Sequence, residues 1–194
     1  MHTSYATHHM LILASASPRR AELLRNAGIE FRVVPPDVPE IRRPLELPLD
    51  YCRRLATEKA QAIAPQYPGD AVLGADTIVV IDGEILGKPA DADEARAMLR
   101  RLSGRVHEVM TGVCLVIEGR QIVEAETTRV HMTEISEEEI EAYVRDGEPM
   151  DKAGAYAIQG IASRWIPRVE GCYFNVVGLP MPRVYAMLQR LVTR

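Results

Sequence analysis

Residues 71–81, "AVLGADTIVVI", constrain the fold more than any other stretch, because they are apolar almost without interruption. Such a run predicts a buried strand, and the Asp82-Gly83 pair after it is typical of a hairpin turn leading into a short returning strand before Pro89. Asp76 interrupts the run. Since an unpaired buried charge is costly, Asp76 needs a hydrogen-bonding partner, a metal ion or a proton to handle. The structural alternative is a carboxylate satisfied by backbone amides at a bulge near Gly74.

Strand and helix patterns alternate along the rest of the chain. Further strands are predicted at 11–14, 29–34, 107–119, 120–135 and 164–180. Helices are predicted from Pro18 to about Gly28, at 49–64, 91–105 and 136–147, and from Pro182 towards the C-terminus. Because hairpins are mixed with crossover helices, the sequence predicts an α/β fold with a mixed twisted sheet and flanking helices.

Composition restricts the kinds of partner and compartment. The 194 residues, 47% of them apolar, suit a soluble globular protein with a sizeable core. The net charge of −4 gives no overall basic field that would favour a nucleic acid or a membrane. No apolar stretch reaches the roughly 18 residues that span a bilayer. Three widely spaced cysteines fit neither a zinc site nor a disulfide framework, so a cytoplasmic protein is predicted.

The first ten residues, "MHTSYATHHM", lack the apolar core of a signal peptide. We interpret residues 1–10 as a flexible leader or a tag remnant rather than a metal-binding tract, and residues 11–194 as a single domain. No repeat, low-complexity tract or shift in composition marks a linker within the chain.

Two arginines occupy an unusual place near the N-terminus. Ser17 and Pro18 fit the N-cap and first position of a helix, which puts Arg19 and Arg20 in its first turn. A helix N-terminus already carries partial positive charge, so two arginines there are mildly repulsive unless an anion lies between them and the free amides. The pair therefore predicts an anion site.

Other polar residues are weaker candidates when each is taken alone. Lys88 lies at a turn and Lys59 on a helix, where lysines are more often solvated than functional. Glu40 follows a proline-rich turn and reads as a loop acid. Gln159 lies in "DKAGAYAIQG", where small residues favour close approach of the backbone to a ligand, and its amide suits the base edge of uracil or thymine.

Together these features indicate a site that binds and cuts a nucleoside triphosphate. Such chemistry uses arginine, lysine and Mg²⁺ to position phosphates and neutralise charge, while a carboxylate orients water or takes its proton. The anion beside Arg19 and Arg20 is then a triphosphate. The pattern GxxxxGK[ST] does not occur, so the site is not a P-loop.

The chain resembles the Maf family of nucleoside triphosphate pyrophosphatases from Leu11 to the final helix. The resemblance is carried by "SASPRRAELL", "GADTIVV", "LGKPADADEARAMLRRLSGR" and "DKAGAYAIQG…GCYFNVVGLP", in the order of the family. It implies a fold like that of inosine triphosphate pyrophosphatases, with two lobes around a cleft, and a homodimer. It also implies a hydrolase that needs a divalent cation, Mg²⁺ or Mn²⁺, and produces a monophosphate and pyrophosphate.

The resemblance also implies roles for individual residues. Asp76, in the "GADT" motif, becomes the proton acceptor that activates water and, with Glu40, a metal ligand. The positions associated with substrate choice are Arg19, Thr77 and Gln159. Further positions that contact phosphate, metal or water are Ser15, Arg20, Glu40, Lys59 and Lys88.

The stretches "AGAYAIQG" and "NVVGLP" are similar to the branch that acts on dTTP, UTP and modified pyrimidine analogues. Cys172, where the family usually has serine, and "IASRW" depart from its pattern. Two alternatives stay open: the same chemistry on 7-methyl-GTP or deaminated purine triphosphates, and a nucleotide-binding regulator of cell division, since the family is also named for inhibition of septum formation.

Overall fold

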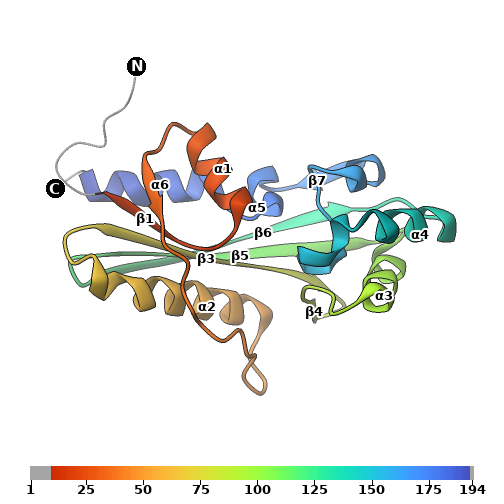
Figure 1. The fold of residues 1–194 in the computed structure, drawn as a ribbon, viewed down its shortest axis with the longest axis horizontal. Coiled ribbons are helices and arrows are strands. Elements are labelled where there is room, and N and C mark those ends of the chain that lie inside the picture. Colours follow the sequence, from red (N-terminus) through yellow and green to blue (C-terminus); the bar gives the residue numbers. More distant parts are fainter. Residues whose placement is uncertain (1–9, 193–194) are drawn as a thin grey trace. The chain divides into compact units, whose positions relative to one another are not determined.

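The computed structural model describes residues 10–192, with side chains as far as Arg190, and Figure 1 shows its fold. Within this part of the chain, a seven-stranded mixed sheet has the order β2-β1-β3-β5-β6-β7, with β4 paired to β3. The predicted α/β class is therefore confirmed. The strands are β1 Leu11–Ala14, β2 Phe31–Val33, β3 Ala71–Ile81, β4 Glu84–Leu86, β5 Val106–Ile117, β6 Arg120–His131 and β7 Arg168–Glu170.

The α-helices match the predicted ones closely, with one short helix in addition. They are α1 Pro18–Asn26, α2 Pro48–Ile63, α3 Ala92–Leu102, α4 Glu137–Asp146, α5 Tyr173–Val177 and α6 Met181–Val192. None of the helices described is long and apolar enough to cross a membrane. Nine of the ten residues interpreted as a leader lie outside the described residues.

The chain divides into two compact units, each considered by itself below. The first comprises the described residues of Met1–Asp76, Thr111–Glu126 and Gly178–Arg194, and the second comprises Thr77–Met110 and Thr127–Val177. The interpretation of residues 11–194 as a single domain stays a prediction.

In the first unit, β1 pairs in parallel with both β2 and β3. Helix α2 covers one face of this part of the sheet, and α1 and α6 cover the other (Figure 1). The apolar side chains of α2 recur three and four residues apart, which gives the helix one face that packs against the sheet. The core cluster between them consists of Ile12, Ala14, Ala56, Ala60, Ile63, Val72 and Cys114.

Two glycines allow α2 to approach the sheet closely. A Cβ atom on Gly74 of β3 would lie 2.2 Å from the Ala56 carbonyl oxygen and 2.7 Å from the Ala60 nitrogen. On β5, a Cβ atom on Gly112 would lie 2.3 Å from the Cys52 carbonyl oxygen. Gly74 is thus required for packing rather than for a bulge.

In the second unit, the predicted hairpin and capping box are confirmed. Strand β4 pairs antiparallel with β3, and the hairpin turns at Asp82 and Gly83, whose φ angles of 54° and 76° suit a type I′ turn. Ser136 and Glu139 form the predicted capping box at the start of α4. Asp91 is the N-cap of α3, and its side chain accepts a hydrogen bond from the Glu94 N–H at 2.9 Å.

The strand predicted across residues 164–180 is wrong over most of its length. Strand β7 covers only Arg168–Glu170, and Tyr173–Val177 form α5. The strand stops at Gly171, whose φ of 124° is outside the strand region. Asn175 is fully buried, and its Nδ2 donates to the Val109 carbonyl oxygen at 2.9 Å. This tertiary contact, which no local pattern reveals, holds α5 against β5.

Substitution Gly74→Ala is expected to lower the free energy of unfolding by about 2 kcal/mol or more, because an added methyl group in a packed interior costs ~1–3 kcal/mol and a backbone carbonyl cannot move aside easily. Chemical denaturation measures this change. The control Gly69→Ala, where a Cβ meets no heavy atom within 4 Å, is expected to stay within ~0.5 kcal/mol of the wild type. Equal stability of the two variants would contradict the close approach of α2 to β3.

Candidate active site

Asp76 lies on the buried side of β3 that faces α2. Side chains two residues apart on a strand share a face, so Asp76 lies on the same side as Gly74, which packs against α2. The side chain of Asp76 is 8% exposed, and its Oδ1 accepts a hydrogen bond from Lys59 Nζ at 2.6 Å. The partner required for a buried carboxylate is therefore a lysine, not backbone amides at a bulge.

Lys59 joins Asp76 to a second acid. Its Nζ also donates to Glu40 Oε1 at 2.5 Å, so one ammonium group bridges two carboxylates. The expectation that Lys59 is solvated is wrong, because its side chain is only 10% exposed. Its spacing from Ala56, Ala60 and Ile63, on the buried face of α2, is the sequence signal that could have revealed this.

Arg20 is the second buried cation of the first unit. Its Nη1 donates to Ser15 Oγ at 3.0 Å, and its Nε donates to the Gly178 carbonyl oxygen at 2.8 Å. Ser17 occupies the predicted N-cap position of α1 but makes no side-chain capping bond; its N–H donates instead to Ser15 Oγ at 3.2 Å. Arg19, next to Arg20 in the first turn, is partly exposed. The contact with Gly178 has no signal in the sequence.

Electrostatics couple Asp76 to both buried cations. Burial raises the pKa of Asp76 above the ordinary value of an aspartate, while the charges of Lys59 and Arg20 act in the opposite direction. Burial lowers the pKa of Arg20, and the negative charge of Asp76 counteracts this effect. A carboxylate with a raised pKa accepts a proton near neutral pH more readily than a surface aspartate does.

Glu40 and Asp76 are the side chains that could hold a divalent cation. Both converge on one cationic centre, the Lys59 ammonium group. Among the residues described, no group of three or more His, Cys, Asp and Glu side chains is arranged to hold a metal ion. Mg²⁺ is commonly bound through one or two carboxylates and completes its shell with water and substrate phosphates. Because both carboxylates bind the same ammonium group, their oxygens lie close enough together to supply ligands for a cation that binds beside Lys59 with a phosphate ligand.

Three predicted site residues, Thr77, Lys88 and Gln159, belong to the second unit. Thr77 is partly buried, and Lys88 and Gln159 are exposed. The N–H of Gly154 donates to the Gly87 carbonyl oxygen at 3.0 Å. This backbone bond joins residues 151–160, the segment that contains Gln159, to Gly87, which precedes Lys88.

Buried aromatic side chains hold the segment around Gln159. The hydroxyl of Tyr156 and Nε2 of His107 share a hydrogen bond of 2.7 Å, and burial lowers the pKa of His107 to about 4. Tyr143 accepts a hydrogen bond from the Ala157 N–H at 3.3 Å. Gln159 is thus an exposed side chain on a backbone that buried contacts fix.

The first unit thus brings a buried arginine in the first turn of a helix together with a buried lysine that bridges two carboxylates. Arginine side chains and helix N-termini are common binding groups for phosphate oxygens. The chain belongs to the family of Maf-like proteins, whose model matches residues 10–191.

Three curated relatives of the chain share one description. A dTTP/UTP pyrophosphatase of Koribacter versatilis is 61% identical over 180 residues, which cover 93% of each chain. A dTTP/UTP pyrophosphatase of Symbiobacterium thermophilum is 56% identical over 178 residues, 92% of each chain. One of Syntrophomonas wolfei is 51% identical over 180 residues, 92% of this chain and 95% of the relative. The similarity thus extends over nearly the full length of these relatives.

Substitution Lys59→Met is expected to lower the free energy of unfolding at pH 7 by about 3 kcal/mol, because it leaves a buried carboxylate without its cation. The double variant Lys59→Met/Asp76→Asn is expected to regain at least about 1 kcal/mol, since no buried charge then lacks a partner. Denaturant titrations of both variants measure the difference. Arg53→Met, which removes an exposed cation from the same helix, serves as the control. A double variant no more stable than Lys59→Met would show that the two side chains do not interact.

Proposed function

We propose that this protein hydrolyses nucleoside triphosphates, with dTTP, UTP and modified pyrimidine analogues as substrates, to a monophosphate and pyrophosphate. The observation that carries the proposal is the buried pair of Lys59 and Asp76 with Glu40 beside it. The description shared by relatives up to 61% identical supports the reaction and the substrates.

Asp76 acts as the general base in this proposal. Water attacks the α-phosphorus, the new P–O bond forms, and the bond from the α-phosphorus to the oxygen that bridges to the β-phosphorus breaks. The proton of the water passes to the Asp76 carboxylate, and pyrophosphate leaves. The raised pKa of Asp76 suits it for this transfer. Lys59 keeps the carboxylate in one orientation through its 2.6 Å hydrogen bond.

Positive side chains bind the phosphates. Arg20 is held by Ser15 and by the Gly178 carbonyl oxygen, so its guanidinium group is oriented before a ligand arrives. Arg19 and the N-terminus of α1 add positive potential beside it. We assign Lys88 a phosphate contact as well, on its match to the family pattern.

Glu40 and Asp76 would hold the divalent cation, Mg²⁺ or Mn²⁺. When bound, such an ion neutralises phosphate charge and polarises a phosphoryl oxygen. The convergence of the two carboxylates on one cationic centre supports this assignment.

Arg19, Thr77 and Gln159 are proposed to select the substrate. The Gln159 amide presents a donor beside an acceptor, which complements the alternating edge of uracil or thymine. Its backbone is fixed by the contacts around Tyr156, which supports a role in recognising one base shape.

We further propose a cytoplasmic homodimer. The three cysteines are free thiols, which suits a reducing compartment. Light scattering tests the dimer, for which the expected mass is about twice the chain mass of 21.6 kDa.

The reaction is tested by incubating the wild-type protein with each common and modified nucleoside triphosphate plus Mg²⁺ or Mn²⁺. Pyrophosphate and orthophosphate are assayed separately. The expected result is pyrophosphate from dTTP and UTP. Orthophosphate alone would mean attack at the γ-phosphorus, and no product from any nucleotide would overturn the enzymatic proposal.

Substitution Asp76→Asn is expected to lower kcat by a factor on the order of 10² or more, because the amide cannot take a proton from water. Circular dichroism checks that the fold is kept. Asp50→Asn removes an exposed carboxylate and is expected to leave kcat unchanged. An Asp76→Asn enzyme with normal turnover would exclude Asp76 as the base.

Substitution Gln159→Glu is expected to reduce kcat/KM for dTTP and UTP by about 10-fold or more relative to purine triphosphates, because it removes a donor from the edge that faces the base. Competition between nucleotides measures this ratio. The control is Gln66→Glu, an exposed glutamine in η1 (Ala64–Gln66). If the pyrimidine preference survives, Gln159 does not read the base.

A further inference from the structure

Glu40 lies in a segment, residues 34–47, that contains no helix or strand. Its side chain is 52% exposed, so burial does not fix its position beside Lys59. A long exposed side chain on an irregular segment samples many positions unless the backbone is held. The contacts that hold this backbone therefore decide whether Glu40 reaches Lys59.

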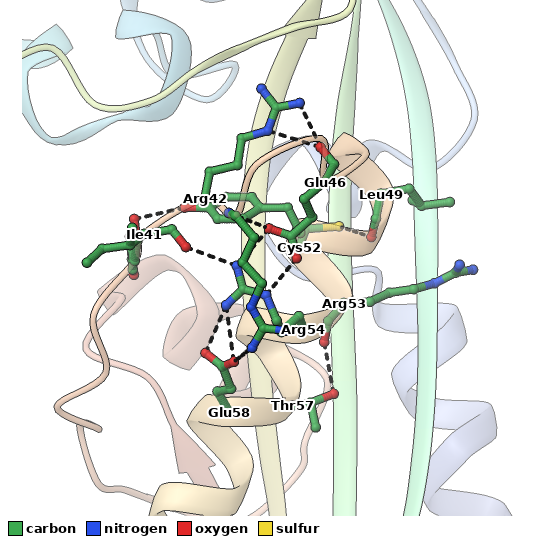
Figure 2. A network of polar contacts seen from close by, with 12 residues as sticks. Ile41, Arg42, Glu46, Leu49, Cys52, Arg53, Arg54, Thr57 and Glu58 are labelled. Carbon is green, nitrogen blue, oxygen red and sulfur yellow. Dashed lines mark hydrogen bonds and ion pairs between the residues drawn. The ribbon is translucent and has the colours of Figure 1, made fainter.

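The second half of the segment is closed on itself. Arg42 donates to the Glu46 carbonyl oxygen through Nη2 at 2.7 Å and Nε at 3.1 Å (Figure 2). The N–H of Arg43 donates to Glu46 Oε2 at 3.1 Å, and the N–H of Glu46 donates to the Arg43 carbonyl oxygen at 3.2 Å. Leu45, at the tip of this turn, is 99% exposed. The turn is thus held by polar contacts at its base, not by apolar packing at its tip.

Arg54 of α2 binds both ends of the turn, at Ile41 and at Glu46. Its Nη2 donates to the Ile41 carbonyl oxygen at 3.0 Å, and its Nε and Nη2 donate to the Glu46 carboxylate at 2.6 and 2.8 Å (Figure 2). Its Nη1 donates to both oxygens of Glu58, one helical turn further along α2. A planar fork with five donors can make all these bonds together, whereas a lysine cannot.

The pair of Arg54 and Glu46 is well protected from water. Their side chains are 15% and 10% exposed. The hydrogen bonds from Arg54 lower the pKa of Glu46 to about 2, so Glu46 stays ionised throughout the neutral range. A charged, forked contact of this kind is stronger than a neutral hydrogen bond.

Helix α2 contacts the start of the turn, residues 40 and 41, through three of its side chains. The Tyr51 hydroxyl donates to the Glu40 carbonyl oxygen at 3.0 Å, Arg54 holds the carbonyl of Ile41, and Lys59 binds the Glu40 carboxylate. The helix therefore sets where the Glu40 backbone lies and where its side chain ends.

We propose that Arg54 is a positioning residue that acts through Glu40: by joining the Ile41 carbonyl oxygen to the Glu46 carboxylate, it holds residues 40–46 where the Glu40 carboxylate meets Lys59. The hydrogen bonds described for Arg54 go to Ile41, Glu46 and Glu58, so its effect on Asp76 is indirect. The inference rests on the proposed function, in which Glu40 is a metal ligand.

A double-mutant cycle separates this role from a general contribution to stability. Pyrophosphate release is measured for the wild type, Arg54→Met, Glu40→Gln and the double variant, at a temperature where circular dichroism shows all four folded. Arg54→Met is expected to lower kcat about 10-fold in the wild-type background, since small displacements of catalytic groups cost up to ~10². In the Glu40→Gln background the same change is expected to cost less than about 2-fold. Equal losses in both backgrounds overturn the proposal.

Two further variants test whether the forked guanidinium group of Arg54, and not its charge alone, is required. Arg54→Lys keeps the charge but not the fork, and its kcat is expected to lie closer to that of Arg54→Met than to the wild type. It also replaces Arg54→Met in the cycle if that variant does not fold. Arg53→Met, on the neighbouring and more exposed arginine, is expected to leave kcat unchanged. Full activity of Arg54→Lys would contradict the need for the fork.

Amide hydrogen exchange gives a readout that needs no activity. The N–H groups of Arg43 and Glu46 are expected to exchange at least ~10-fold faster in Arg54→Met or Arg54→Lys than in the wild type, and at the wild-type rate in Arg53→Met. Unchanged exchange in the Arg54 variants would overturn the proposal. A wild-type enzyme that yields no pyrophosphate overturns the proposed function instead, while the exchange rates still decide whether Arg54 holds the turn.

Discussion

The close approach of α2 to β3 is the constraint on which the candidate site depends. Gly74 leaves no side chain between the strand and the helix, so the backbone around Ala56 and Ala60 lies against the sheet. From that position Lys59 can reach Asp76, which lies two residues beyond Gly74 on the same face of the strand. A bulkier residue at position 74 would move the helix away and leave two buried charges apart, each without its partner.

Helix α2 connects two parts of the protein that have different physical characters. Its apolar face packs into the core of the first unit, where position is fixed by dense contact. Tyr51 and Arg54 contact an irregular segment, where position is fixed by a few directed hydrogen bonds. Lys59 meets both parts, because one of its bonds goes to the buried strand and the other to that segment. Helix α2 thus brings the buried carboxylate of Asp76 and the more exposed carboxylate of Glu40 to the same ammonium group.

Much of the fold could be read from the sequence, because it depends on local periodicity and on turn residues. The apolar run of 71–81, the Asp82-Gly83 turn and the capping box at Ser136 each specify their element through nearby residues alone. The prediction across 164–180 is wrong where the strand stops at Gly171 and where Asn175 of α5 is buried against Val109, 66 residues away in the sequence. Local patterns contain no information about such a partner.

For the site, the residues alone indicate that Asp76 is an unusual charge inside an apolar strand, that Arg20 lies in the first turn of a helix, and to which family the chain belongs. The burial of Lys59, its bridge from Asp76 to Glu40 and the contacts by which Arg54 holds the segment around Glu40 are visible only in the folded chain. A lysine or an arginine on a helix has the same local pattern whether it contacts water or a carboxylate. What differs is the chain that packs against it, and that chain comes from distant positions in the sequence.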